Sequence, residues 1–277
     1  MSYLQYGTIL NFKNKSVIYS QNSFLDNNNF FVYFVIKGKI IIAKKLSNNN
    51  FFRIGLGKNM IFGLSESSHE TKKRIISAIA VEDCELYRWK YDDFILNIQV
   101  SITLARIATY SLCRELRFLN EKKEQNFFNE QNLTADSEIE ITEDTEVQNC
   151  LYNLAFNTDI VEIDENIIAK FGKTFKKNDI MIHENDVSND FFIIHKGEAE
   201  ILKNEKVIAK IRSGEIVGEM SYFDKMPRTA TVRALTEVSV IVLRPENFNI
   251  LYQLHPEWSI KIIKSMSNRI FKAYNDL

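Results

Sequence analysis

Hydrophobic and polar positions along this chain form a pattern that occurs twice. Residues 33–38 and 192–197 are each an apolar run closed by Lys-Gly, and a second strand-like run follows each of them. Two apolar runs that meet at a glycine are typical of a β-hairpin. Each copy then continues into a further stretch of β-forming residues, 75–89 in the first and 231–243 in the second. Self-similarity of this kind predicts two copies of one β-domain in tandem.

Helical spacing follows each of these stretches. Residues 92–120 contain neither proline nor glycine, and apolar residues recur there every three to four positions, which predicts helix. Further on, Pro245 opens a second helical segment, and Pro256 fits the first turn of a third, where proline is favoured. The last segment carries a stripe of apolar residues on one face, formed by Ile262, Met266, Ile270 and Ala273. We therefore expect each β-domain to be flanked by helices.

An acidic stretch separates the two copies. Six Asp or Glu residues crowd into positions 136–146 and are interleaved with Ser and Thr, a composition typical of a linker or an exposed loop. A length of 277 residues suits two domains. We therefore predict a first domain over residues 1–121, a linker over 122–147 and a second domain over 148–277.

Charge and composition exclude several classes of function. The 35 basic and 36 acidic residues leave a net charge of -1, so no basic surface for nucleic acid is expected. The N-terminus shows no signal peptide, and the longest wholly apolar run, residues 30–36, is about a third of a membrane span. We expect a cytoplasmic protein with no nucleic-acid or membrane partner. Cys84, Cys113 and Cys150 are too far apart for a disulfide framework or a zinc site, so no metal is expected.

The most informative residues are a glycine, an acid and an arginine in the second copy. Gly218 allows a turn and close approach of the backbone to a ligand. Arg228 suits a phosphate, because its planar fork can give two parallel charged hydrogen bonds. A carboxylate beside a phosphate, such as that of Glu219, needs a neutral donor, and a ribose 2′-hydroxyl is one. Together they predict a ribose-phosphate pocket, with the free N–H groups of a short helical turn over residues 219–223 facing the anion.

These residues resemble a known motif. Residues 218–220 (Gly-Glu-Met) and 228–234 (Arg-Thr-Ala-Thr-Val-Arg-Ala) closely resemble the phosphate-binding cassette of the cyclic-nucleotide-binding domains. That family includes cAMP-dependent kinase regulatory subunits, gated channels and catabolite activator proteins. The resemblance covers nearly all of residues 170–250. Met220 and Ser221 stand where the family usually has leucine and alanine, a change that leaves the backbone amides available.

The resemblance implies both a fold and a ligand. It implies a mainly β protein with flanking helices, built from two tandem eight-stranded jelly rolls. It implies a receptor that is not an enzyme and that binds cAMP, or alternatively cGMP, in the second domain. The residues implied to bind the cyclic nucleotide are Val217, Gly218, Glu219, Met220, Ser221, Arg228, Thr229 and Ala230.

Roles for single residues follow from the same resemblance. Glu219 would contact the ribose 2′-hydroxyl, Arg228 the cyclic phosphate, and backbone amides near Met220 and Ser221 would complete the cradle. In this family the helices after the roll swing toward the cassette when ligand binds, which makes Phe271 and Tyr274 candidate lid residues. The signal would pass to a partner protein, and the C-terminal helices are a candidate homodimer surface.

The residue after the cassette arginine bears on which nucleotide is bound. In the family, threonine there can contact the guanine amino group, and cGMP-selective members use it. It also occurs in cAMP binders, so Thr229 leaves cAMP as the expected ligand and cGMP as the alternative.

The first copy resembles the fold but not the ligand site. Alignment of the two copies puts Arg74 opposite Arg228 and Gly63 near the cassette glycine, with one residue inserted between them. Leu64 stands where the cassette has glutamate, and the loop 65–70 offers a carboxylate only from another position. We therefore interpret Arg74 as a surface or structural arginine and expect one nucleotide per chain.

Two other interpretations make different demands on the sequence. A metal-binding cupin needs a closely spaced histidine pair, whereas His183 and His195 stand twelve residues apart. A ligand-free fold used as a structural or protein-interaction module stays open, and nucleotide binding is the observation that separates it from a receptor.

Overall fold

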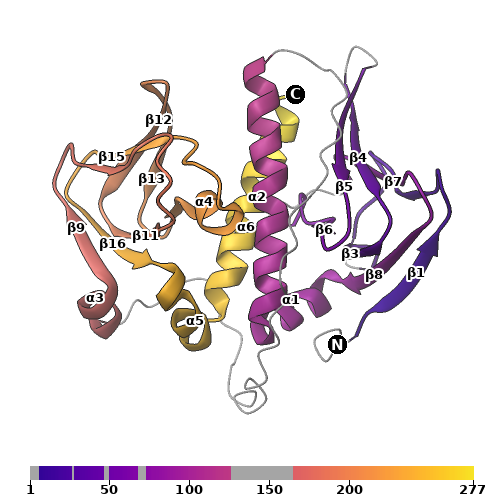
Figure 1. The fold of residues 1–277 in the computed structure, drawn as a ribbon, viewed down its shortest axis with the longest axis horizontal. Coiled ribbons are helices and arrows are strands. Elements are labelled where there is room, and N and C mark those ends of the chain that lie inside the picture. The colour runs from indigo at the N-terminus through magenta and orange to yellow at the C-terminus, as the bar shows by residue number, and fades with distance from the viewer. Residues whose placement is uncertain (1–5, 27, 47–49, 68–72, 126–164) are drawn as a thin grey trace. The chain divides into compact units, whose positions relative to one another are not determined.

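The structure is a computed structural model, and it describes residues 6–26, 28–46, 50–67, 73–125 and 165–277 (Figure 1). Within this part, the chain divides into two compact units. Unit 1 holds the described residues from 6 to 125 together with Ser259–Leu277. Unit 2 holds residues 165–258. Most of the predicted linker, residues 126–147, and the start of the predicted second domain, 148–164, lie outside the described residues.

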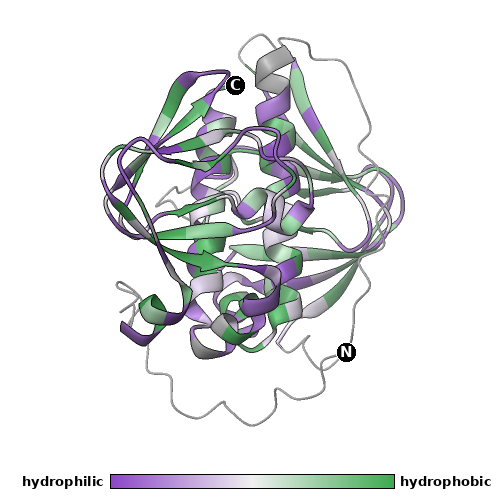
Figure 2. Ribbon diagram, turned by 60° about the vertical axis from the view of Figure 1, so that its left-hand side comes forward, coloured by the Kyte–Doolittle hydropathy of each residue, from purple (hydrophilic) through white to green (hydrophobic). Residues whose placement is uncertain are grey.

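The first copy is a roll of eight strands in two antiparallel sheets of four, with orders β1-β8-β3-β6 and β2-β7-β4-β5. Alternation builds these sheets: in β7, Ala78 and Ala80 are fully buried, whereas Ser77 and Ile79 on the other face are partly exposed. The same alternation of hydrophobic and hydrophilic positions runs along the strands in Figure 2. The strands are β1 (Thr8–Phe12), β2 (Val17–Tyr19), β3 (Phe31–Lys37), β4 (Ile40–Lys45), β5 (Phe51–Leu56), β6 (Ile61–Phe62), β7 (Ser77–Ala80) and β8 (Cys84–Lys90).

The second copy repeats this topology strand for strand. Its sheets have orders β10-β15-β12-β13 and β14-β11-β16-β9, which are the orders of the first copy advanced by eight. The predicted tandem of eight-stranded rolls is therefore confirmed. The strands are β9 (Gly172–Phe175), β10 (Ile180–Ile182), β11 (Phe191–Lys196), β12 (Glu198–Lys203), β13 (Lys206–Arg212), β14 (Ile216–Val217), β15 (Thr231–Ala234) and β16 (Val238–Leu243).

The predicted hairpins at the Lys-Gly positions are wrong. β3 and β4 follow each other in sequence but belong to different sheets, and so do β11 and β12. Gly38 and Gly197, both with φ of 94°, turn the chain from one sheet to the other. A true hairpin joins β12 to β13, where Asn204 and Glu205 supply the two positive φ angles that a tight two-residue turn needs.

Helices flank both rolls as predicted. The helical stretch after the first roll is two helices, α1 (Tyr91–Val100) and α2 (Ile102–Gln125), separated at Ser101. The backbone of Ser101 is extended, and its hydroxyl accepts a hydrogen bond of 3.2 Å from the Leu104 N–H, which caps α2. The helices of the second half are α3 (Glu165–Phe171), α4 (Glu219–Asp224), α5 (Pro245–Leu254) and α6 (Glu257–Asn275). None of the helices in the described ranges is both long and apolar enough to cross a membrane.

Most of α6 groups with the first copy, although the sequence assigned it to the second domain. Residues Ser259–Leu277 belong to unit 1, where α6 runs beside α2 (Figure 1). The predicted apolar stripe of α6 is buried, and the Cys113 thiol of α2 lies 4.0 Å from the Met266 sulfur. The apolar stripe of α6 is therefore covered within unit 1.

Candidate functional site

The loop that follows β14 is shaped by Gly218. This residue is the N-cap of α4 and has a φ of 87°, in the left-handed region that favours glycine. A Cβ atom at this position would lie 2.8 Å from Arg228 Nη1 and 2.8 Å from Ile182 Cδ1. Glycine therefore lets the arginine side chain lie directly against the loop.

Arg228 is held by uncharged acceptors. Its Nη1 donates to the Gly218 carbonyl at 2.6 Å, its Nη2 donates to the Asp190 carbonyl, and its Nε donates to the Ser188 hydroxyl at 3.2 Å. The backbone of Arg228 is fixed as well, because it exchanges hydrogen bonds with Asn185 and Asp186. These bonds engage three of the five N–H donors of the guanidinium and set its plane.

The guanidinium of Arg228 is buried. The side chain is 3% exposed, and burial lowers the pKa of its guanidinium, while the nearby carboxylates of Asp190, Glu219 and Asp186 act to raise it. A buried cation whose hydrogen bonds go to neutral groups attracts an anion strongly, because little water reaches it. Glu219, 2% exposed, begins α4 immediately after Gly218. The structure thus brings the glycine, the acid and the arginine of the predicted cassette together.

The other predicted contact residues surround this loop. Val217, Met220 and Ser221 are buried, whereas Thr229 and Ala230 are partly exposed just before β15. The Thr229 carbonyl accepts a hydrogen bond of 2.9 Å from Lys203 Nζ, which ties the segment after Arg228 to β12.

Two residues that orient Arg228 were missed at the level of sequence. Ser188 contributes its hydroxyl and Asp190 its backbone carbonyl, both from the loop that leads into β11. A carbonyl acceptor has no signature in sequence, and serine in a polar loop is too common to single out.

An aromatic cluster joins the cassette helix to α5. We define it as Phe191, Tyr222, Phe223 and Phe248, whose ring centroids lie 4.8 to 6.3 Å apart. Tyr222 and Phe223 come from α4 and Phe248 from α5, and Phe191 in β11 is fully buried. The rings of α4 are therefore in direct contact with the ring that α5 contributes.

The candidate lid residues both lie in α6, within the part that belongs to unit 1. Tyr274 is fully buried there, and its hydroxyl donates a hydrogen bond of 2.8 Å to Glu115 Oε1 in α2. Phe271 is partly exposed. To cover a nucleotide base, Tyr274 would have to leave this packing.

The first copy also buries its arginine. Arg74, 3% exposed, forms an ion pair of 3.0 Å with Glu66 in the loop after β6. The structure therefore excludes a surface location for Arg74 and gives it a structural contact.

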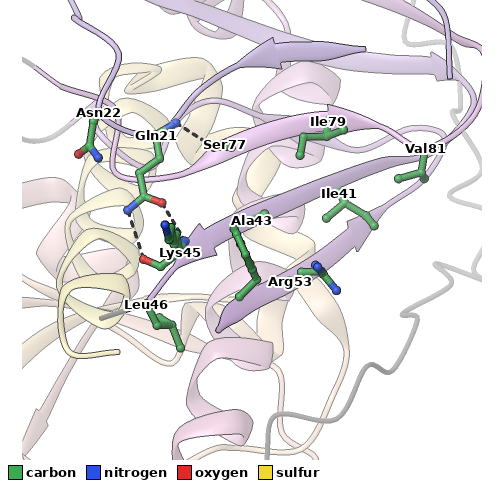
Figure 3. Close-up of a pocket in the computed structure, with 11 residues that line it drawn as sticks. Gln21, Asn22, Ile41, Ala43, Lys45, Leu46, Arg53, Ser77, Ile79 and Val81 are labelled. Atoms are coloured by element: carbon green, nitrogen blue, oxygen red, sulfur yellow. Dashed lines mark hydrogen bonds between the residues drawn. The ribbon is translucent and has the colours of Figure 1, made fainter. Parts of the chain in front are cut away.

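A pocket of about 780 Å³ lies elsewhere in the first copy, over strands β4, β5 and β7 (Figure 3). Its wall is largely apolar, and Gln21 closes one end through hydrogen bonds with Ser77 and the Lys45 backbone. Neither Arg74 nor Glu66 lines it.

The comparison with known families identifies the second copy. The model of the family described as "Cyclic nucleotide-binding domain" matches residues 172–255. This segment is a cyclic nucleotide-binding domain. The match includes the whole cassette, from Gly218 through Ala234.

Relatives resemble this chain over short stretches. A cGMP-dependent protein kinase of Eimeria tenella is 42% identical over 64 residues, which is 23% of this chain and 6% of that protein. A cAMP-dependent protein kinase regulatory subunit of Schizosaccharomyces pombe is 33% identical over 76 residues, 27% of this chain and 18% of that protein. The chain thus matches less than a fifth of the length of these curated relatives. A solved structure, the regulatory domain of Toxoplasma gondii PKA with cAMP, is 14% identical with a TM-score of 0.29, covering 98% of this chain and 86% of that chain.

Proposed function

We propose that this protein is a non-enzymatic cyclic nucleotide receptor that binds cAMP in its second copy and signals to a partner protein. The observation that carries the proposal is the setting of Arg228. Its guanidinium is buried, is oriented by two carbonyls and a hydroxyl, and lies beside the loop that begins with Gly218 and Glu219. The hydrogen bonds that orient it go to neutral acceptors, which suits a site whose ligand brings the negative charge.

Each residue then has a distinct task. The N–H donors of Arg228 that the protein does not engage would bind the exocyclic oxygens of the cyclic phosphate, with the backbone amides near Met220 and Ser221. The Glu219 carboxylate would accept a hydrogen bond from the ribose 2′-hydroxyl, which fixes the sugar. Thr229 keeps cGMP as the alternative ligand, since its hydroxyl can accept a bond from a guanine amino group.

The aromatic cluster offers a route for the output. Ligand that draws α4 toward Arg228 would move Tyr222 and Phe223, and α5 would follow through Phe248. The relatives named as kinase regulatory subunits make a protein kinase catalytic chain the partner class that we propose. A ligand-free interaction module is the rival function, and direct binding distinguishes the two.

Calorimetric titration of the whole chain with cAMP tests this proposal. Wild-type protein should bind cAMP, and Arg228→Ala should lose about 2–5 kcal/mol, because truncation removes one partner of a buried charge pair. That loss is roughly thirty- to several-thousand-fold in affinity. Glu219→Ala should cost about 1.5–3 kcal/mol, the contribution of a charged hydrogen bond.

Arg233→Ala is the matched control. Arg233 lies in β15, shortly after Arg228; its side chain is 41% exposed and pairs with Glu200 in β12, so its removal should change nucleotide affinity little. Parallel titration with cGMP ranks the two nucleotides. Wild-type affinity in a folded Arg228→Ala chain would contradict the assignment, and no binding by wild-type protein would favour the ligand-free module.

A further inference from the structure

The two copies hold their arginines in the same scaffold. Arg74 donates through Nη1 to the Gly63 carbonyl at 3.4 Å and through Nη2 to the Phe31 carbonyl at 3.3 Å. In the second copy the corresponding carbonyls belong to Gly218 and Asp190. These positions match in the strand registers, and both glycines have a positive φ, 91° in the first copy and 87° in the second.

The copies differ in whether a carboxylate accepts a hydrogen bond from the arginine side chain. The Glu66 carboxylate accepts a hydrogen bond from Arg74 Nη1 on one oxygen and from the Ile75 N–H on the other, each at 3.0 Å. Its own backbone N–H supplies a further bond. One carboxylate is thus bound by a guanidinium and two backbone amides.

The donors occupy the positions of the cassette. Ile75 follows Arg74 as Thr229 follows Arg228, and Glu66 lies three residues after its loop glycine, as Ser221 does. Ser221 is one of the two residues near which backbone amides are expected to bind phosphate in the second copy. The carboxylate of Glu66 therefore sits among the groups of the first copy that correspond to a phosphate cradle.

The surroundings of this pair are fully enclosed. Glu66 is 0% exposed, and the guanidinium of Arg74 lies over the rings of Tyr19 and Phe30, at 4.3 and 5.1 Å. Burial raises the pKa of Glu66, while Arg74 and the Ile75 N–H oppose that rise. A carboxylate is costly to bury unless it is paired and hydrogen-bonded, and here it is both.

We propose that the first copy retains an anion-binding site whose phosphate position is filled by the Glu66 side chain. The chain supplies its own anion, so the site excludes phosphate and phosphate esters for as long as Glu66 occupies it. Removal of the carboxylate exposes a site of the chemical class that takes inorganic phosphate. The correspondence rests on the proposed function of the second copy, whereas the test below does not require the second copy to bind a nucleotide.

The filled site also connects to α6. Ser65, the neighbour of Glu66, donates a hydrogen bond of 3.3 Å to Glu115 Oε1, the same oxygen that accepts from Tyr274. Displacement of the Glu66 loop therefore disturbs the hydrogen bonds that anchor Tyr274 within unit 1.

Equilibrium dialysis of the whole chain against labelled inorganic phosphate tests the proposal. All variants carry Arg228→Ala, so that the second copy does not contribute. Glu66→Ser, which installs the residue type found at position 221, should bind one phosphate per chain where the Arg228→Ala parent binds none. Its thermal midpoint should rise with phosphate, because a ligand that binds only the folded state stabilises it, and should not rise in chloride of equal ionic strength.

Glu82→Ser is the matched control, because it removes an exposed carboxylate from the same unit with the same change in net charge. It should bind no phosphate. If Glu66→Ser does not fold in chloride, refolding in phosphate is measured, and recovery in phosphate alone supports the proposal. The isosteric Glu66→Gln variant is tested in the same way. Phosphate binding that is equal in parent and variants, or absent from both Glu66 variants, would overturn it.

Discussion

At the level of single residues, Arg74 and Arg228 pose the same physical problem. Each is a permanent cation placed in a poorly hydrated pocket and oriented by two backbone carbonyls. In the first copy a glutamate of the same chain neutralises it, whereas in the second the acceptors are neutral. A loop glycine with positive φ is common to both: a Cβ at Gly218 would lie 2.8 Å from the guanidinium of Arg228, and a Cβ at Gly63 would lie 2.8 Å from the Phe31 carbonyl that orients Arg74.

Substitution of the loop glycine tests that approach. Gly218→Ala should cost about 1–2 kcal/mol of stability through its left-handed φ, and should also lower cAMP affinity about tenfold or more, since the new Cβ meets Arg228 Nη1 at 2.8 Å. Gly214→Ala is the control: its φ of +86° imposes the same strain, but nothing lies within 4 Å of its Cβ. Thermal unfolding and calorimetry on both variants separate strain from collision. Equal nucleotide affinity in the two variants would mean that this contact does not position Arg228.

At the level of elements, alternation and periodicity predicted the type of most strands and helices, but not how they pair. The Lys-Gly junctions were interpreted as hairpins because neighbouring strands usually pair. Yet Gly38 and Gly197 turn the chain from one sheet to the other. The strands on either side of each glycine pair with strands that lie elsewhere in the sequence, such as β8 for β3 and β7 for β4. The cassette could be predicted from the sequence because its pattern consists of residue types, those of Gly218, Glu219 and Arg228. The carbonyl of Asp190 and the carboxylate of Glu66 could not be assigned, since their roles depend on where the fold brings them.

The contact between α2 and α6 should depend on pH. Burial raises the pKa of Glu115 from 4.5 to about 7, and the negative charge of Glu66 adds to this, while hydrogen bonds from Tyr274 and Ser65 lower it. The folded state then binds a proton more tightly than the unfolded state, so this contribution to stability is complete below pH 4.5 and is lost as the pH rises through 7. At about 1.4 kcal/mol per pKa unit, the loss is on the order of 3 kcal/mol.

Urea unfolding at several pH values between 5 and 8 measures this dependence. Glu115→Gln should flatten the decline in stability, because the amide does not titrate. Glu121→Gln, at an exposed position of the same helix, should leave the decline unchanged. A Glu115→Gln chain that loses as much stability with rising pH as wild type would assign the decline to other groups.

At the level of the whole molecule, the two copies differ in what they bury and what they present. The first copy fills its own anion site and buries most of α6, and the second presents the cassette and connects it to α5. This division leads us to expect one bound nucleotide per chain. We also expect a conformational change in the second copy to alter α6, because this helix begins in unit 2 and continues in unit 1.

Hydrogen exchange with and without cAMP tests this expectation. Binding should slow exchange in α4 and across residues 246–275, since packed rings connect α4 to α5 and the lid residues lie in α6. The Arg228→Ala chain at the same cAMP concentration is the control and should show no change. Protection confined to α4, with α5 and α6 exchanging as in the free protein, would describe a module that binds without switching.

The division of unit 1 into two stretches of sequence has a consequence for how the protein is made. α2 ends at Gln125, and the partner that buries Cys113 and Glu115 begins only at Ser259. At synthesis rates of roughly 5–20 residues per second, α6 leaves the ribosome on the order of ten seconds after α2. During that interval the part of α2 that packs against α6 has no native cover, whereas the described part of unit 2 is contiguous and emerges before α6 is complete. The second copy can therefore reach its native state on the ribosome first, and the first copy, which precedes it in the sequence, is completed second.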